Sequence, residues 1–148
     1  MFFPTTEQFE TLESVQAFFD KMSDGLMLVD RKWYIKLVNS TVEKIMKRPK
    51  SKIIGLTIGE GLGCIHTGDS RDGCGYGSIC GYCIVLNVIK YSLRSQKYVL
   101  KQKGKFAMGV GDKLIRPRLD VSTHYLMIEG QRYVMMAIHN PESIIAKH

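Results

Sequence analysis

Residues 26–58 read LMLVDRKWYIKLVNSTVEKIMKRPKSKIIGLTI and contain the pattern that decides the fold. Two runs in this stretch, Leu26–Asp30 and Tyr34–Asn39, are rich in aliphatic and β-branched residues and predict two strands. The three residues between them, 31–33, are few enough to join the strands as a β-hairpin. The hairpin is therefore the first unit of sheet along the chain.

A short helix is predicted directly after the hairpin. Ser40 and Glu43 have the spacing of a capping box for a helix over Thr41–Lys47. Pro49 stops that helix, and Lys50–Ile54 predicts one further helical turn. Strands and helices thus follow one another within a few residues, which indicates a mixed fold.

Upstream of the hairpin, residues 5–22 predict a helix because apolar residues recur at three- and four-residue steps. Thr5 and Gln8 fit a capping box, and residues 23–25 end the helix. Residues 1–24 are therefore expected to form an N-terminal helical segment. Its apolar stripe is interpreted as part of the core or as the seam of a homodimer.

Downstream, residues 79–96 predict a long helix, and the end of the chain predicts three strands. The strands are expected at 98–103, 116–127 and 132–139, with a turn at Glu129-Gly130 between the last two. This order of elements predicts an α+β fold, in which helices pack on one face of an antiparallel five-stranded sheet. A length of 148 residues fits a single domain covering residues 1–148.

Composition limits the class of protein. An apolar fraction of 45% and a charged fraction of 24% are those of a soluble globular domain. No apolar run is long enough to span a membrane, and the N-terminus lacks the basic start of a signal peptide. We therefore expect a cytoplasmic protein in which thiols stay reduced.

The formal net charge is +7, but the basic residues are spread over the chain. They do not form a nucleic-acid-binding motif with interleaved aromatic residues, so no nucleic-acid partner is expected. The densest local group is interpreted as a solvated basic face and consists of Lys44, Lys47, Arg48, Lys50 and Lys52.

All four cysteines lie in GEGLGCIHTGDSRDGCGYGSICGYC, residues 59–83. They are Cys64, Cys74, Cys80 and Cys83, spaced C-x9-C-x5-C-x2-C. Nine of the fourteen glycines lie between Gly55 and Gly81, which lets the backbone turn tightly around a bound group. Clustered cysteines in a reducing compartment favour metal binding, so residues 56–83 are expected to form a metal-binding loop before the long helix.

Four thiolates suit a zinc ion, a 2Fe–2S cluster or a 4Fe–4S cluster by number. Ligand loops this rich in glycine favour an iron–sulfur cluster, with zinc as the alternative. Covalent haem is disfavoured because Ile84, and no histidine, follows the C-x-x-C. His66 is expected to lie in the second shell of the site, and the predicted strand residues His124 and His139 are interpreted as ordinary partnered or surface histidines.

The rival chemistry is thiol–disulfide exchange by Cys80 and Cys83, because a C-x-x-C at a helix start lowers the pKa of its first thiol. A glycine-rich loop precedes this motif, where thioredoxin-like proteins have a strand, so we rank this alternative below metal binding. The sequence contains no acid–base constellation, and no enzyme activity is expected.

The segment at residues 26–58, including the Val38-Asn39 pair before the short helix, resembles the first half of a PAS domain. LDVSTHYLMIEGQRYVMMAIHN, residues 119–140, resembles the last hairpin of that fold. The cysteine segment resembles that of a cysteine-rich subset of bacterial PAS sensor domains. The resemblance implies that Cys64, Cys74, Cys80 and Cys83 hold an iron–sulfur cluster, and that the domain senses redox state, oxygen or a related oxidant.

One position departs from the family pattern. His139-Asn140-Pro141 stands where many PAS domains have an Asp-Ile-Thr-like triplet that couples the sheet to an effector helix. The chain also contains no kinase, cyclase or DNA-binding module, so the expected output is through an unidentified signalling partner or a longer protein. The alternative within the same fold is a domain with a structural zinc that binds a small ligand or a partner.

Overall fold

The computed structural model describes residues 9–66 and 83–148. Its centre is a five-stranded antiparallel sheet in the order β2-β1-β7-β6-β3. The expected α+β class with a five-stranded antiparallel sheet is confirmed. The strands of this sheet are β1 (Gly25–Asp30), β2 (Ile35–Val38), β3 (Val99–Lys105), β6 (Arg118–Ile128) and β7 (Gln131–Ile138).

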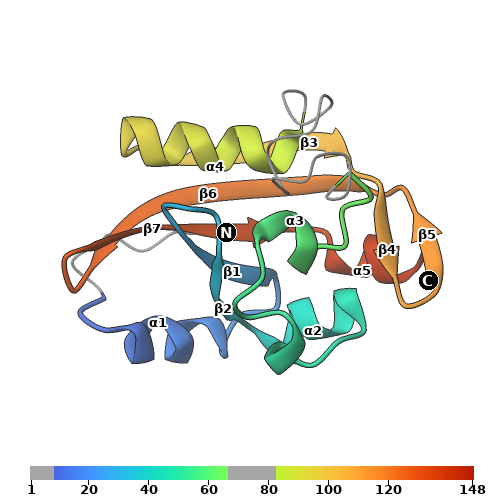
Figure 1. Cartoon of the computed structure of the whole chain (residues 1–148), viewed down its shortest axis with the longest axis horizontal. Coiled ribbons are helices and arrows are strands. Elements are labelled where there is room, and N and C mark those ends of the chain that lie inside the picture. The colour runs from blue at the N-terminus through green and yellow to red at the C-terminus, as the bar shows by residue number, and fades with distance from the viewer. Residues whose placement is uncertain (1–8, 67–82) are drawn as a thin grey trace.

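The hairpin expected from residues 26–39 is present as β1 and β2, and the last hairpin is present as β6 and β7 (Figure 1). β1 also pairs with β7, from Gly25 opposite Ile138 to Asp30 opposite Tyr133. The first and last strands of the sheet therefore lie side by side at its centre. The β1–β7 pairing joins two strands that are about a hundred residues apart in the sequence.

The sheet has a core on each face. On the inner face, Met27, Val29 and Val134 pack against the helices that follow β2 and precede β3. On the outer face, Leu26, Leu28 and Met135 pack against the N-terminal helix. The alternation follows from the two-residue period of a strand, because neighbouring side chains point to opposite faces.

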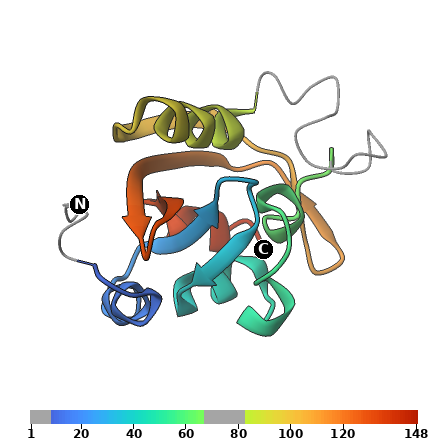
Figure 2. The ribbon, with the colours of Figure 1, turned by 60° about the vertical axis from the view of Figure 1, so that its left-hand side comes forward.

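The N-terminal helix, α1 (Leu12–Phe19), is shorter than the helix expected over residues 5–22. Thr11 is its N-cap in an extended conformation, and Thr11 and Ser14 form the capping box in place of Thr5 and Gln8, which lie outside the described residues. The apolar stripe of α1 packs on its own sheet, where Val15 and Phe19 are buried (Figure 2).

The short helix α2 (Ser40–Met46) has a different cap from the one expected. Asn39, and not Ser40, is the N-cap, because its side-chain oxygen accepts a hydrogen bond from the Val42 N–H at 3.2 Å. Glu43 instead accepts a hydrogen bond from the Lys50 N–H at 2.9 Å. The helix ends at a left-handed Lys47, and the expected turn after Pro49 is a 3-10 helix over Lys50–Lys52.

The long helix, α4 (Ile84–Ser95), begins later than the predicted position near residue 79. Cys83 precedes it in an extended conformation, with φ −73° and ψ 119°, so Cys83 does not lie in the first helical turn. Cys80 lies outside the described residues. Val85, Val88 and Ile89 of α4 are buried against the inner face of the sheet.

Four short elements were not expected from the sequence. They are α3 (Ile58–Gly61), the hairpin strands β4 (Met108–Val110) and β5 (Lys113–Ile115), and α5 (Pro141–Ile145). β4 and β5 pair with each other as a separate two-stranded sheet. The expected loop over residues 56–83 is therefore helical in the part that α3 occupies.

Candidate functional site

The entry to the cysteine segment is held by α3. Thr57 and Glu60 form a capping box at its start. At its end, the Arg48 guanidinium donates to the carbonyl oxygens of Gly61 at 2.6 Å and Glu60 at 3.1 Å. Arg48 was interpreted from the sequence as part of a solvated basic face, and that interpretation is wrong for this residue. Arg48 fixes the backbone three residues before Cys64.

Gly63 makes a close backbone contact with β4. The Gly109 N–H donates to the Gly63 carbonyl at 2.7 Å, and the Ile65 N–H donates to the Ala107 carbonyl at 3.3 Å. A Cβ atom on Gly63 would lie 2.3 Å from the Gly109 oxygen, and Gly63 has a φ of +67°. Both observations require glycine at this position. The start of the cysteine segment is thus joined to the β4–β5 hairpin.

Cys64 follows directly and forms an isolated β-bridge with Met108. Its Sγ accepts a hydrogen bond from the His66 N–H at 3.4 Å, and the side chain is partly buried against the inner-face core. A backbone N–H directed at sulfur favours the thiolate over the thiol. His66 therefore contributes its backbone to the surroundings of Cys64.

Cys83 closes the segment as the N-cap of α4. Its carbonyl accepts a hydrogen bond from the Asn87 N–H at 3.0 Å, and its side chain packs against the same inner-face core as Cys64. Cys74 and Cys80, the other two expected ligands, lie outside the described residues. Within residues 9–66 and 83–148, no three His, Cys, Asp or Glu side chains form a metal-binding group.

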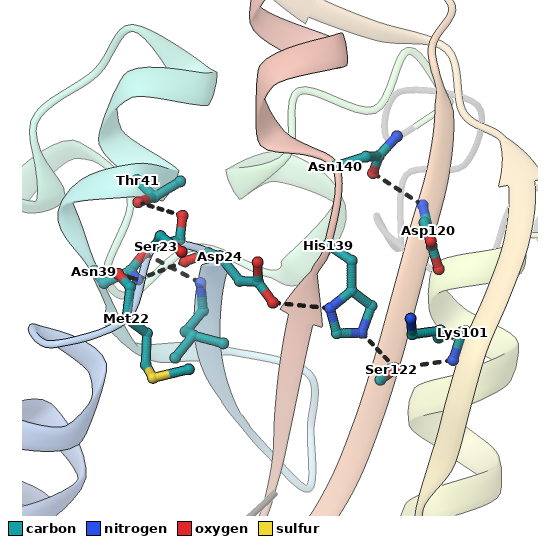
Figure 3. A network of polar contacts seen from close by, with 11 residues as sticks. Met22, Ser23, Asp24, Asn39, Thr41, Lys101, Asp120, Ser122, His139 and Asn140 are labelled. Atoms are coloured by element: carbon teal, nitrogen blue, oxygen red, sulfur yellow. Dashed lines mark hydrogen bonds and ion pairs between the residues drawn. The ribbon is translucent and has the colours of Figure 1, made fainter. Parts of the chain in front are cut away.

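A polar network joins the two central strands at the end where α1 and α5 attach (Figure 3). The His139 ring shares one hydrogen bond with the Asp24 carboxylate, at 2.8 Å, and another with the Ser122 hydroxyl, at 2.6 Å. Ser122 Oγ also accepts the Lys101 N–H at 2.8 Å. His139 is a partnered histidine, as expected, although it lies just after β7.

Asp24, His139 and Ser122 are hydrogen-bonded in the same order as the Asp, His and Ser of a hydrolase catalytic triad, but their burial does not support that chemistry. A nucleophilic serine must be reachable by substrate. Ser122 is fully buried, and its oxygen is already bonded to a β3 backbone N–H. The network is therefore a structural connection between β1, β6, β7 and β3.

Asn39 forms the neighbouring half of this network (Figure 3). Its side-chain oxygen accepts from the Leu26 N–H at 3.1 Å, and its amide donates to the Asp24 carbonyl at 2.7 Å. The Thr41 hydroxyl donates to the Ser23 carbonyl at 3.1 Å. The Val38-Asn39 pair belongs to the PAS-like pattern of the sequence, but that pattern does not predict the contacts of Asn39.

No helix in the part of the chain that the structure describes is long and apolar enough to cross a membrane. No protein-family model and no curated protein matches the chain. Solved structures do match. The chain is similar to the PAS domain of nitrogen regulation protein NR(II) from Vibrio parahaemolyticus, with a TM-score of 0.59 and 13% identity over 84% of this chain and 95% of that one.

Two further similarities are of the same kind. A PAS domain from Colwellia psychrerythraea matches with a TM-score of 0.57 and 14% identity, over 86% of this chain and 94% of that one. The PAS domain of an HTR-like protein from Haloarcula marismortui matches with a TM-score of 0.54 and 13% identity, over 86% and 88%. The chain therefore has a PAS-like fold, as the sequence resemblance predicted.

Proposed function

From this PAS-like fold with four clustered cysteines, we propose that the chain is a non-catalytic sensory domain. Cys64, Cys74, Cys80 and Cys83 bind one iron–sulfur cluster, and the domain senses redox state or oxygen. In this proposal the domain works in the reducing cytoplasm and passes its signal to a partner or to another domain. The structures that it resembles include a PAS domain from a two-component sensor histidine kinase.

One observation supports the proposal above the others. Cys64 and Cys83 stand at the two ends of the cysteine segment, and both pack against the inner-face core. Their thiols are thus presented on the same side of the sheet, although 18 residues of chain separate them. Two thiolates anchored this way, with two more cysteines between them on the chain, fit the donor set of a four-cysteine cluster.

The residues around Cys64 and Cys83 suggest how a change in the proposed cluster would be transmitted to the rest of the domain. When bound, a cluster would supply one-electron chemistry and a net negative charge. Cys64 is joined to β4 through the Gly63–Gly109 contact, and Cys83 is the N-cap of α4. A displacement of the two thiols relative to each other therefore moves the β4–β5 hairpin against α4. Both elements pack on the inner face of the sheet.

A structural zinc is the second candidate, since the same four thiolates satisfy it by ligand type. Anaerobic purification followed by metal and sulfide analysis and a visible absorption spectrum separates the two. Iron with inorganic sulfide and a broad visible band is expected. A colourless protein that holds one zinc ion would contradict the sensor mechanism and leave the four ligands in place.

Matched variants complete this test. Cys74→Ser is expected to abolish iron retention, whereas Ser78→Cys leaves the original four thiols and is expected to retain iron. The thiol–disulfide alternative predicts that the metal-free protein reduces a disulfide substrate and that Cys80→Ser abolishes this turnover. No turnover by the metal-free protein would exclude that alternative.

A further inference from the structure

A basic cleft lies at the opposite end of α4 from Cys83. It consists of two adjoining cavities, both open to solvent, of about 470 Å³ and about 350 Å³, which share Arg31, Lys32 and Arg132. The rise of α4 separates Cys83 from Arg94 by about 16 Å along the helix axis. The cationic residues that line the cleft are Arg31, Lys32, Lys36, Lys90, Arg94 and Arg132.

These cations come from four elements that meet on one side of the molecule. Arg31 and Lys32 belong to the β1–β2 turn, Lys36 to β2 and Arg132 to the start of β7, while Lys90 and Arg94 lie in the C-terminal half of α4. In Figure 1 the C-terminal end of α4 and the turn between β6 and β7, after which Arg132 follows, are on the left-hand side. The tertiary fold therefore brings these cations together, unlike the charged residues on one exposed face of a helix, which are neighbours through the helical repeat alone.

The lining contains one carboxylate, that of Asp30, and it is already engaged. One of its oxygens accepts the Lys32 N–H at 2.9 Å and the Tyr34 N–H at 3.0 Å. The other oxygen lies 3.6 Å from the Lys36 ammonium. Asp30 can therefore balance one of the six cations, and the remaining positive charges repel one another.

Two of the cations are held in place by contacts within the cleft wall. The Arg132 guanidinium donates to the Leu93 carbonyl at 2.6 Å, and its Nε is buried with no hydrogen-bond partner among the described residues. The Lys90 ammonium lies 4.9 Å from the centre of the Trp33 ring. These contacts hold Arg132 and Lys90 in place in the wall of the cleft, so a bound anion would meet charges that are already positioned.

We propose that the basic cleft binds a small molecule that carries a chain of two or three phosphate groups. Each cavity has the size of a small-molecule site. Arg31, Lys32 and Arg132 line both cavities, whereas Lys36 lines only the smaller one and Lys90 and Arg94 only the larger one. A single phosphate would therefore leave cations at one end of the cleft unmatched, and a phosphate chain spreads several negative charges along its whole length. Arginine is suited to this ligand because its planar fork bonds two phosphate oxygens at once.

The test uses the full-length protein and its single tryptophan, Trp33, which lines the larger cavity. Inorganic tripolyphosphate and a nucleoside triphosphate are titrated separately, at low salt and without divalent metal, while tryptophan fluorescence and binding heat are recorded. Saturable binding of one equivalent that weakens with salt is expected. Equal affinity for the two probes would show that the cleft recognises the phosphate chain alone. Tighter binding of the nucleoside triphosphate would show that the cleft also contacts the nucleoside.

The decisive comparison is between two double variants of equal charge. Arg31→Gln with Arg94→Gln removes two cations from the cleft, and about tenfold weaker binding or more is expected. Lys103→Gln with Lys105→Gln removes two exposed cations from β3, which does not line the cleft, and affinity within about twofold of the original is expected. Thermal unfolding of both variants checks that they remain folded.

Three results would overturn the proposal. The first is the absence of saturable binding of either probe. The second is an equal loss of affinity in the two double variants, which would show unspecific attraction to the net charge. The third is tighter binding of single-stranded DNA or of an acidic peptide than of tripolyphosphate, which would assign the surface to a macromolecule.

Discussion

Asn39 shows how much of the fold depends on one buried polar side chain. Its oxygen accepts the N–H groups of Leu26 in β1 and Val42 in α2, and its amide donates to the Phe19 carbonyl at the end of α1. Asn39 is fully buried, so water cannot replace any of these bonds. The start of β1, the start of α2 and the end of α1 therefore share one side chain.

Replacement of Asn39 by alanine is expected to lower the free energy of unfolding by about 3 kcal/mol, because it removes a helix cap and leaves buried backbone groups without partners. Urea unfolding measures the loss. Ser40→Ala is the matched control, since Ser40 is exposed and is not the cap, and a change within about 0.5 kcal/mol is expected. A comparable loss in both variants would show that the cap has been assigned to the wrong residue.

At the scale of elements, the contact between Gly63 and β4 holds the backbone next to Cys64 in place against the β4–β5 hairpin. Gly63→Ala would introduce a Cβ atom 2.3 Å from the Gly109 oxygen and would also strain a φ of +67°. Backbone strain, overpacking and a weakened hydrogen bond together are expected to cost about 3 kcal/mol. If Cys64 is a metal ligand, as proposed above, loss of bound metal should accompany the change.

Gly111→Ala is the control for that prediction. Gly111 has a similar φ of +63°, but a Cβ atom there would meet nothing within 4 Å. The strain of positive φ alone is expected to cost about 1 kcal/mol and to leave metal content unchanged. Thermal unfolding and metal analysis of both variants check this pair, and equal effects would argue against the close contact.

The strands that were predicted correctly are those that contain a sufficiently long apolar run. β1 and β7 have nearly continuous runs of aliphatic residues, and β6 has apolar residues along most of its eleven positions, so all three can be recognised from sequence. The β4 and β5 strands have three residues each, and α3 has four, so no period can be read in them. Helix starts were misplaced because a cap depends on which side chain reaches the free N–H groups: Thr11 for α1 and Asn39 for α2.

For the candidate site, spacing and composition predict the four cysteines as one ligand set, which stays a prediction, and they give no signal for the contacts that hold Cys64 in place. Arg48 binds the end of α3 from 12 and 13 residues away in sequence, and Gly109 meets Gly63 from 46 residues away. Contacts of this range depend on tertiary structure and leave no local signal. The basic cleft was missed for the same reason, because its cations come from separate elements.

For the whole molecule, the balance between folded and unfolded chains should depend on pH through His124. This residue stacks on Tyr98, with ring centroids 6.2 Å apart, and burial lowers its pKa below the ordinary value of 6.5. Below about pH 6.5 the unfolded chain therefore takes up a proton that the folded chain resists. Acidification through this range should lower the free energy of unfolding.

Urea unfolding at a series of pH values measures this effect. His124→Gln, which cannot take up that proton, should lose less stability than the original protein between about pH 7 and about pH 5.5. The difference between the two proteins isolates His124 from every other titrating group. Parallel curves for the two proteins would show that His124 titrates alike in the folded and unfolded chains.

The pairing of Gly25 with Ile138 has a mechanical consequence. Segments attached at the start of β1 and at the end of β7 leave the sheet at the same end of two antiparallel neighbours. Tension between them would load the ladder one residue pair at a time, as in unzipping, and would not share the force among many bonds as shear does. The Asp24–His139 hydrogen bond, which joins residues 115 apart in sequence, stands just outside the first of those pairs and would carry the force first.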